Sequence, residues 1–161
     1  MKLLLTSLLL FMSLQASATQ QIKEEFTVDQ ARFEISQLPL DSYIDQKSFH
    51  EKVKPQMCSA NWRGYRGSWA LEKEMLVLRY LVANACDKSP KPIDVDTIFP
   101  NKSYPIAATW YTGKIIVRIG ERTFLSPKEH GLSGVEYEAV VYDFHSGKLV
   151  SRSIETITNR W

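Results

Sequence analysis

Alternating apolar and polar residues predict a chain built mainly of β-strands. In residues 30–36 the apolar side chains fall on one side of an extended chain and the charged ones on the other, which predicts a half-buried first strand. Residues 135–144 are rich in β-branched and aromatic residues, residues 145–148 have turn composition, and residues 149–157 return as a strand. This last unit is therefore predicted to be a β-hairpin.

A second predicted hairpin lies in the middle of the chain and is flanked by the two cysteines, Cys58 and Cys86. Residues 65–71 alternate, and the charged residues 72–74 make a turn. Residues 75–82 are nearly continuous in apolar side chains, so we expect them to be buried on both faces and central in the sheet.

Residues 41–54 carry helix-like rather than strand-like spacing. Asp41 or Ser42 could cap this helix, and Pro55 would end it. With six to eight short strands, the fold class we expect is mainly β: an antiparallel sheet curled into a small barrel or sandwich, with one short helix and one disulfide. The alternative is an α+β fold in which the helix at 41–54 is larger.

The first eighteen residues have the pattern of a secretory signal peptide. Lys2 precedes an apolar run over residues 3–14, and the small residues 16–18 fit a cleavage site after Ala18. The run is shorter than the roughly 20 apolar residues that span a bilayer, so we expect no stable membrane anchor. The predicted organisation is a signal peptide at 1–18, a flexible tail at 19–29 and one β-rich domain at 30–161, in a periplasmic or secreted protein.

Export changes the interpretation of the two cysteines. In an oxidising compartment a lone pair of thiols is expected to form a disulfide, and Cys58 and Cys86 both follow the predicted cleavage site. Their spacing fits neither a CxxC redox motif nor a zinc pattern, so we predict no metal site. A bridge closing this loop would stabilise the fold by about 3 to 4 kcal/mol.

Composition excludes several classes of function. The 161 residues are 44% hydrophobic and 24% charged, as in an ordinary globular domain, and the formal net charge is only +2. Together with export, this near-neutral charge argues against a nucleic-acid partner. The chain contains no Gly-rich phosphate loop, no GxSxG elbow and no HExxH motif, so no cofactor is expected.

Aromatic and basic residues supply the candidates for a binding surface. Trp, Tyr and Arg are enriched at binding hot spots, since they bury a large area and can still donate hydrogen bonds or stack. Tyr65 and Trp69 share a strand face with an apolar neighbour, which favours a place in the core. The predicted binding residues are Trp62, Arg63, Arg66, Trp110 and His130.

A catalytic arrangement is the weaker interpretation. His130 and His145 lie among acidic residues, so a His/carboxylate acid–base pair across the last hairpin is conceivable. Nearness in sequence is poor evidence for a catalytic constellation, and both histidines have the setting of solvated loop or turn residues. We therefore assign no catalytic residue and favour a protein that is not an enzyme.

The central and later aromatic motifs resemble those of a family of small bacterial proteins without an established activity. The resemblance rests on Trp62-Arg63-Gly64-Tyr65 with Trp69 after it, the leucine-rich return at 76–78, the Trp-aromatic-Thr-Gly run at 110–113, and the loop and strand at 131–138. It covers residues 33–150. The chain departs from the family pattern in its signal peptide and its cysteine pair. The resemblance implies a fold and leaves the function open.

Two hypotheses of different class follow. The first is a non-enzymatic binding or inhibitory module of the immunity-protein type, whose partner is another protein in the periplasm. The second is a ligand carrier or enzyme with a pocket in the β fold, to which His130 or Arg66 would contribute.

Overall fold

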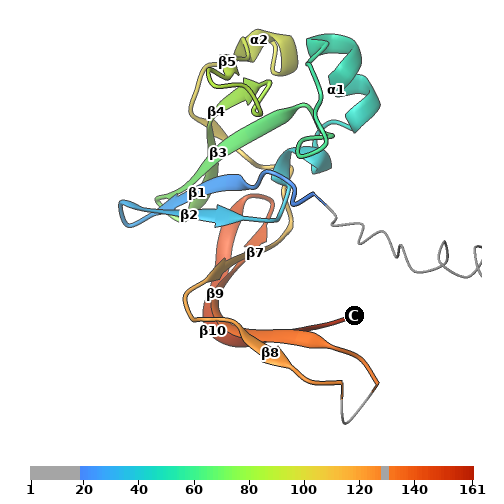
Figure 1. Cartoon of the computed structure of the whole chain (residues 1–161). Coiled ribbons are helices and arrows are strands. Elements are labelled where there is room, and N and C mark those ends of the chain that lie inside the picture. Colours follow the sequence, from blue (N-terminus) through green and yellow to red (C-terminus); the bar gives the residue numbers. More distant parts are fainter. Residues whose placement is uncertain (1–18, 128–130) are drawn as a thin grey trace, which may run out of the picture.

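A computed structural model describes residues 19–127 and 131–161, and it contains one mixed β-sheet with helices at one end (Figure 1). The predicted signal peptide, residues 1–18, lies outside the described residues. Within those residues no helix is long and apolar enough to span a membrane. The strands are β1 (Glu24–Val28), β2 (Ala31–Ile35), β3 (Tyr65–Glu72), β4 (Met75–Ala83), β5 (Lys91–Pro92), β6 (Ile106–Ala107), β7 (Gly113–Arg118), β8 (Thr123–Leu125), β9 (Gly134–His145) and β10 (Lys148–Arg160).

The sheet is open. Its main strand order is β2-β1-β3-β4-β10-β9-β7, with β5 and β6 paired to β4 and β8 paired to β9. The prediction of a mainly β fold with one disulfide is confirmed, but the sheet does not close, so a small barrel is not what forms. The pairing is also not wholly antiparallel, because β1 runs parallel to β3.

The two edge strands of the main path, β2 and β7, nevertheless approach each other. Their Cα atoms come within 8 Å, yet no backbone ladder joins them. A side chain makes the link: the backbone N–H of Ile116 donates to Oε1 of Gln37, 3.3 Å away. The curled sheet thus has a seam between β2 and β7, where both edges keep unpaired backbone groups.

Three short helical segments differ from the single helix predicted. The 3-10 helix η1 spans Pro39–Ser42, α1 spans Gln46–Val53, and α2 spans Val95–Ile98. The cap of α1 is Asp45, not Asp41 or Ser42. Its carboxylate accepts from the Ser48 hydroxyl at 2.7 Å and from Ser48 N–H at 3.0 Å, and these bonds lower its pKa. The helix is therefore shorter than the larger helix of the α+β alternative.

The central hairpin has the predicted form. Strands β3 and β4 pair antiparallel around a two-residue turn, Lys73 and Glu74, both with positive φ. Trp69 is fully buried and Tyr65 nearly so, as expected for core residues. A register shift between Ser68 and Trp69 marks a bulge in β3.

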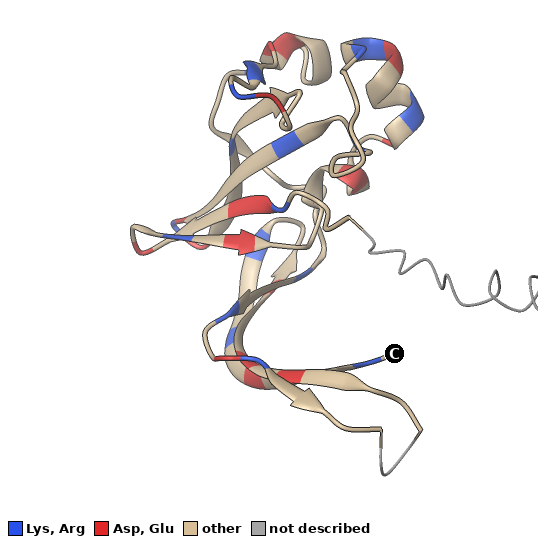
Figure 2. Cartoon of the chain, viewed as in Figure 1, with Lys and Arg blue, Asp and Glu red and all other residues tan. Residues whose placement is uncertain are grey.

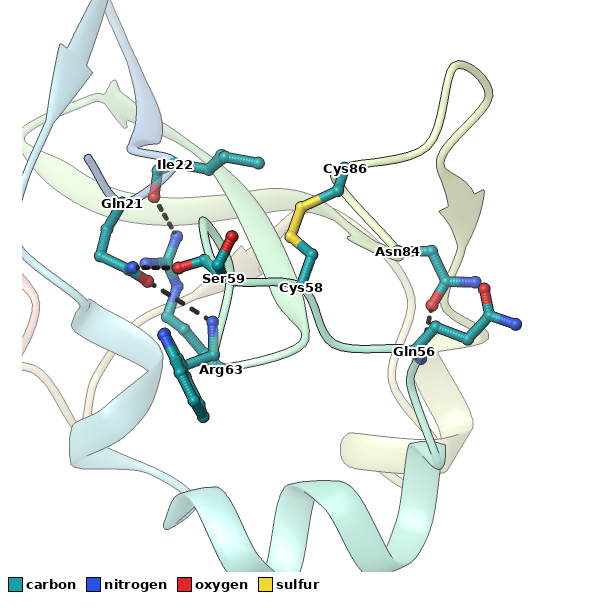
Figure 3. Close-up of a disulfide and its surroundings, with 9 residues drawn as sticks. Gln21, Ile22, Gln56, Cys58, Ser59, Arg63, Asn84 and Cys86 are labelled. Carbon is teal, nitrogen blue, oxygen red and sulfur yellow. Dashed lines mark hydrogen bonds between the residues drawn. A yellow bond between two sulfur atoms is a disulfide. The ribbon is translucent and has the colours of Figure 1, made fainter. Parts of the chain in front are cut away.

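The disulfide joins the loop before β3 to the loop after β4, as predicted for Cys58 and Cys86 (Figure 3). On one side of the bridge, the N–H of Gln56 donates to Oδ1 of Asn84 at 2.8 Å. On the other side, Nε2 of Gln21 donates to the carbonyl of Ser59 at 2.7 Å. The bridge and the Gln21 hydrogen bond together connect three segments that are far apart in the sequence.

The prediction of a flexible tail over residues 19–29 is wrong for the second half of that segment. Residues 24–28 form β1, which pairs with β2 on one side and with β3 on the other. Phe26 and Val28 are buried in the core. The sequence pattern does not indicate this strand, because charged residues stand at its start and one of them, Glu24, occupies a fully buried position.

The β9–β10 hairpin is longer than predicted and extends away from the helices, with β8 beside it (Figure 1). We call residues 119–127 and 131–161 the arm. Its base is covered: Tyr142 packs edge-on against Phe26, with ring centroids 5.4 Å apart. Toward its tip, Phe124, Leu132 and Trp161 are exposed.

Candidate functional site

The predicted binding residues do not form one surface. Trp62 is 62% exposed, as predicted, and its backbone N–H donates to Oε1 of Gln21 at 3.4 Å. Arg63 is mostly buried, with an 11% exposed side chain. Its guanidinium donates to the carbonyl of Ile22 at 2.7 Å and to Oε1 of Glu24 at 2.9 Å. Arg63 therefore holds the segment before β1 against the loop before β3.

Arg66 and Trp110 have separate surroundings. Arg66 is part-buried on β3 and lies 3.6 Å from the carboxylate of Glu25. Trp110 stacks on Phe99, with centroids 5.2 Å apart, and its indole N–H donates to the carbonyl of Pro39 at 3.0 Å. Trp110 thus attaches the helical end of the sheet to the loop before β7. His130 lies outside the described residues.

Among the described residues, Glu24 is the one fully buried carboxylate, and it lies at the centre of a polar cluster. Its Oε2 accepts from Gly67 N–H at 2.8 Å and from Trp69 Nε1–H at 2.9 Å, and its Oε1 forms the ion pair with Arg63. A Cβ at position 67 would overlap this carboxylate and the indole nitrogen of Trp69. Glycine is therefore required there by close approach.

Burial raises the pKa of Glu24 from its ordinary value of 4.5 to about 7. The charge of Arg63 and the hydrogen bonds from Trp69 and Gly67 act in the opposite direction. All of the contacts to this carboxylate come from inside the fold and the residue has no exposed surface. The cluster therefore organises the β1–β3 junction, and a substrate would have no route to it.

A groove lies along the seam between β2 and β7. Its central hollow has a volume of about 330 Å³. The side chains that line it come from the segment before β1, from β2 and the residues after it, from β7, from the loop before β8 and from β9. They are Lys23, Arg32, Phe33, Glu34, Ser36, Gln37, Ile116, Arg118, Arg122 and Tyr137. We call this the seam groove.

Cations dominate the seam groove. Four basic side chains line it, Lys23, Arg32, Arg118 and Arg122, against one acid, Glu34. Figure 2 shows basic positions recurring along the chain from β7 toward β8. The clustering contrasts with the net charge of +2 for the whole chain.

Two of these cations have acidic neighbours and two do not. Lys23 lies 3.8 Å from Glu34, and Arg32 lies 3.9 Å from Glu25, distances that give weak, solvent-screened attraction. Within residues 19–127 and 131–161, Arg118 and Arg122 have no ion-pair partner. Both are exposed at the arm side of the groove.

The groove continues along the N-terminal segment. Lys23 also lines two neighbouring hollows, of about 450 and 550 Å³. The first of these includes Arg63 and Arg122, and the second includes Arg66. Gln21 lines both and contacts Trp62, so the exposed indole lies near this end of the groove.

Sequence reasoning missed the residues of the seam groove. Lys23 falls in the segment predicted to be a flexible tail, Arg32 lies on the charged side of the predicted first strand, and no sequence motif marks Arg118 or Arg122. They come from positions almost a hundred residues apart, and only the curl of the sheet brings them together. The one local signal was the presence of basic residues at the ends of β-like runs, which is common on any protein surface.

Catalytic and metal chemistry has no comparable support among the described residues. No group of three or more His, Cys, Asp or Glu side chains in that part of the chain could hold a metal ion. His145 is exposed at the β9–β10 turn. His50, part-buried on α1, bonds through Nε2 to the carbonyl of Arg63 at 2.9 Å.

The chain was compared with protein families, curated proteins and solved structures to test the resemblance and the function. No protein-family model, curated protein or solved structure matches it, so the resemblance to the Trp-Arg-Gly-Tyr family stays a hypothesis.

Proposed function

We propose that this protein is an exported, non-enzymatic binding module that holds an acidic segment of another protein in the seam groove, as an inhibitor or immunity-type protein would. The observation that carries the proposal is the convergence of Lys23, Arg32, Arg118 and Arg122 around one hollow. These side chains come from three separate segments of the chain, and a common ligand would explain why they meet.

An anionic ligand fits the charge of the groove. Like charges brought together repel one another, and a bound anion removes that repulsion. Arg118 and Arg122 have no acidic partner in the described part of the chain, so their guanidinium groups are available for paired hydrogen bonds to a carboxylate.

A protein segment fits the groove better than a small molecule does. Sites for small molecules are mostly apolar concavities with a few polar groups, whereas charged and polar side chains form most of this lining. Lys23 joins the central hollow to two others, which makes an elongated site. The alternative function, a ligand carrier or enzyme with a pocket in the β fold, would need a more enclosed cavity.

Trp62 supplies a second kind of contact at the end of this site. Trp62 is exposed, and its backbone N–H donates to Oε1 of Gln21, which lines two of the hollows. Binding hot spots commonly combine an exposed aromatic side chain with charged residues around it, and Trp62 beside the cationic groove has this arrangement.

Direct binding tests the proposal. The probe is a fluorescently labelled peptide of about ten glutamates, titrated with the purified protein at low and physiological salt. We expect salt-sensitive binding, weakened about tenfold or more by the double change Arg118→Glu and Arg122→Glu, because each reversal replaces attraction by repulsion. Trp62→Ala should weaken binding of the native partner more than binding of this probe, because the probe has no apolar group to contact the indole.

The matched control is Lys88→Glu with Lys102→Glu, which changes the net charge equally at exposed positions outside the groove. Equal loss of binding in both double variants would show that only net charge matters and would contradict the proposal. Equally tight binding of a single-stranded oligonucleotide of the same charge would contradict an acidic protein as the partner.

A further inference from the structure

The outer edge of β10 has almost no strand partner. Over its whole length β10 pairs with β9, but on its other side it pairs with β4 only through Lys148 and Met75. From Val150 to Arg160, no described strand covers this edge. About half of the backbone N–H and C=O groups of an edge strand point outward, so this edge presents a long row of unpaired groups.

Exposed apolar side chains accompany the open edge. Six of the ten large hydrophobic residues that are exposed in the described chain belong to the arm. They are Ile119, Phe124, Leu132, Val150, Ile154 and Trp161. Ile154, in the middle of β10, is 70% exposed.

Several devices that protect edge strands in other proteins are missing from this one, although it carries the charged residues Arg152, Glu155 and Arg160. Natural proteins block open edges with proline, bulges or very short strands. β10 has 13 residues and contains no proline or glycine. Its one irregularity, between Leu149 and Ser151, lies at the start and leaves the rest of the edge regular.

We propose that two copies of this chain pair antiparallel through the outer edges of β10, with a two-fold axis at Ile154. In such a pair, a residue a given number of positions before Ile154 lies opposite the residue the same number of positions after Ile154 in the partner. The two-fold axis is perpendicular to the sheet, so opposed side chains lie on the same face. The two sheets then join into one continuous sheet.

The register follows from charge. An axis at Arg152 or Glu155 places two like charges directly opposite, and an axis at Thr156 opposes Arg152 to Arg160. An axis at Ile154 opposes Ile154 to itself, Ser153 to Glu155 and Arg152 to Thr156. It pairs residues 150–158 without a like-charge pair, and it is the longest such register of the open edge.

This pairing would leave the seam groove accessible, because no residue of β10 lines its central hollow. The inference therefore does not depend on the proposed function. It rests on the open edge, on the exposed Ile154 and on the self-complementary sequence.

The oligomeric state in solution tests the inference. Analytical ultracentrifugation of the purified protein up to about 100 μM should show a reversible dimer, as expected for a micromolar or tighter complex. Ile154→Asp places two carboxylates opposite each other and should raise the dissociation constant at least tenfold. Met57→Asp is the matched control, because Met57 is also an exposed apolar residue, 54% exposed, and lies far from β10 in sequence. Both variants should keep the wild-type circular dichroism spectrum.

Cysteine cross-linking tests the register. Ile154→Cys should give a disulfide-linked dimer, since directly opposed residues have Cα atoms about 4.5–5.5 Å apart. Arg152→Cys alone should not cross-link, because the two copies of residue 152 are about 13 Å apart along the strand. A mixture of the Arg152→Cys and Thr156→Cys variants should cross-link, because these two residues lie opposite each other in the proposed pair. A monomeric wild-type protein, a dimer unaffected by Ile154→Asp, or cross-links at Arg152→Cys alone would each overturn the inference.

Discussion

The two long hairpins of this protein have similar turns and opposite surroundings. The β3–β4 turn uses Lys73 and Glu74, and the β9–β10 turn uses Ser146 and Gly147, each pair with two positive φ values. Yet five residues of β3 are buried and none of β10 is. A hairpin can therefore be specified locally by its turn, whereas its burial depends on which distant segments pack against it.

The covering segments explain the difference. The β3–β4 hairpin is covered by β1, α1 and the loop before β7, and the ion pair of Glu24 and Arg63 lies inside this cover. Beyond Lys148, the outer edge of β10 pairs with no strand among the described residues, and its contact with the β1–β2 turn is the ion pair of Arg152 and Asp29 at 3.7 Å. The first hairpin forms part of the core, whereas the second keeps exposed side chains and an open edge.

The largest expected effect is in the covered hairpin. Trp69→Ala should destabilise the protein by about 3–5 kcal/mol, because it leaves a cavity and removes a hydrogen bond to Glu24. The matched change in the arm, Trp161→Ala, should cost less than about 0.5 kcal/mol, since that side chain is 62% exposed. Chemical denaturation of both variants measures the contrast, and equal losses would break the comparison.

The disulfide should rank next. Replacing both cysteines, Cys58→Ser with Cys86→Ser, should lower the free energy of unfolding by about 3 kcal/mol, since the 28-residue separation is no longer constrained in the unfolded chain. The melting temperature should fall while the circular dichroism spectrum stays unchanged. A melting temperature that is the same in oxidising and reducing buffer would contradict a stabilising role.

The buried carboxylate predicts a pH dependence. The pKa of Glu24 is about 7 in the folded protein and 4.5 when unperturbed, so the folded state binds the proton more tightly. This group's contribution to stability is therefore full below about pH 4.5 and is lost as the pH rises through 7. From pH 5 to pH 8 the loss should be on the order of 2 kcal/mol.

Glu24→Gln should flatten that pH profile, since glutamine does not titrate. Denaturation curves at several pH values for the wild type and the variant measure the two slopes. The prediction fails if the wild type gains stability between pH 5 and pH 8 and the variant does not.

The smallest expected effect lies at the tip of the arm. Phe124 on β8 is 78% exposed, so Phe124→Ser should change the free energy of unfolding by less than about 0.5 kcal/mol. A larger loss in the monomer would show that the arm has an internal packing role, and the contrast between the two hairpins would then be smaller than we describe.

Most strands could be predicted from the sequence, but β1 could not. In residues 22–28 the inward positions are Ile22, Glu24, Phe26 and Val28, so a charge interrupts the apolar alternation. That charge is tolerated because Arg63, 39 residues later, and donors on β3 meet it. Local pattern has no access to such a distant partner.

The site was harder to predict than the fold. Exposure of Trp62 was anticipated, but Arg63 and Trp110 hold segments of the fold together. Each cation of the seam groove lies in an unremarkable local setting. Their common feature is position in space, which follows from the approach of β2 to β7.

By itself the sequence determined what depends on near neighbours: the positions of most strands, both hairpin turns, the burial of Tyr65 and Trp69, and the pairing of the only two cysteines. Tertiary structure alone decided the parallel insertion of β1, the open seam, the grouping of its cations and the bare edge of β10. The physical reason is range. Turn geometry and alternation act over a few residues, whereas the pairing of strand edges and the clustering of charges are set by contacts between distant parts of the chain.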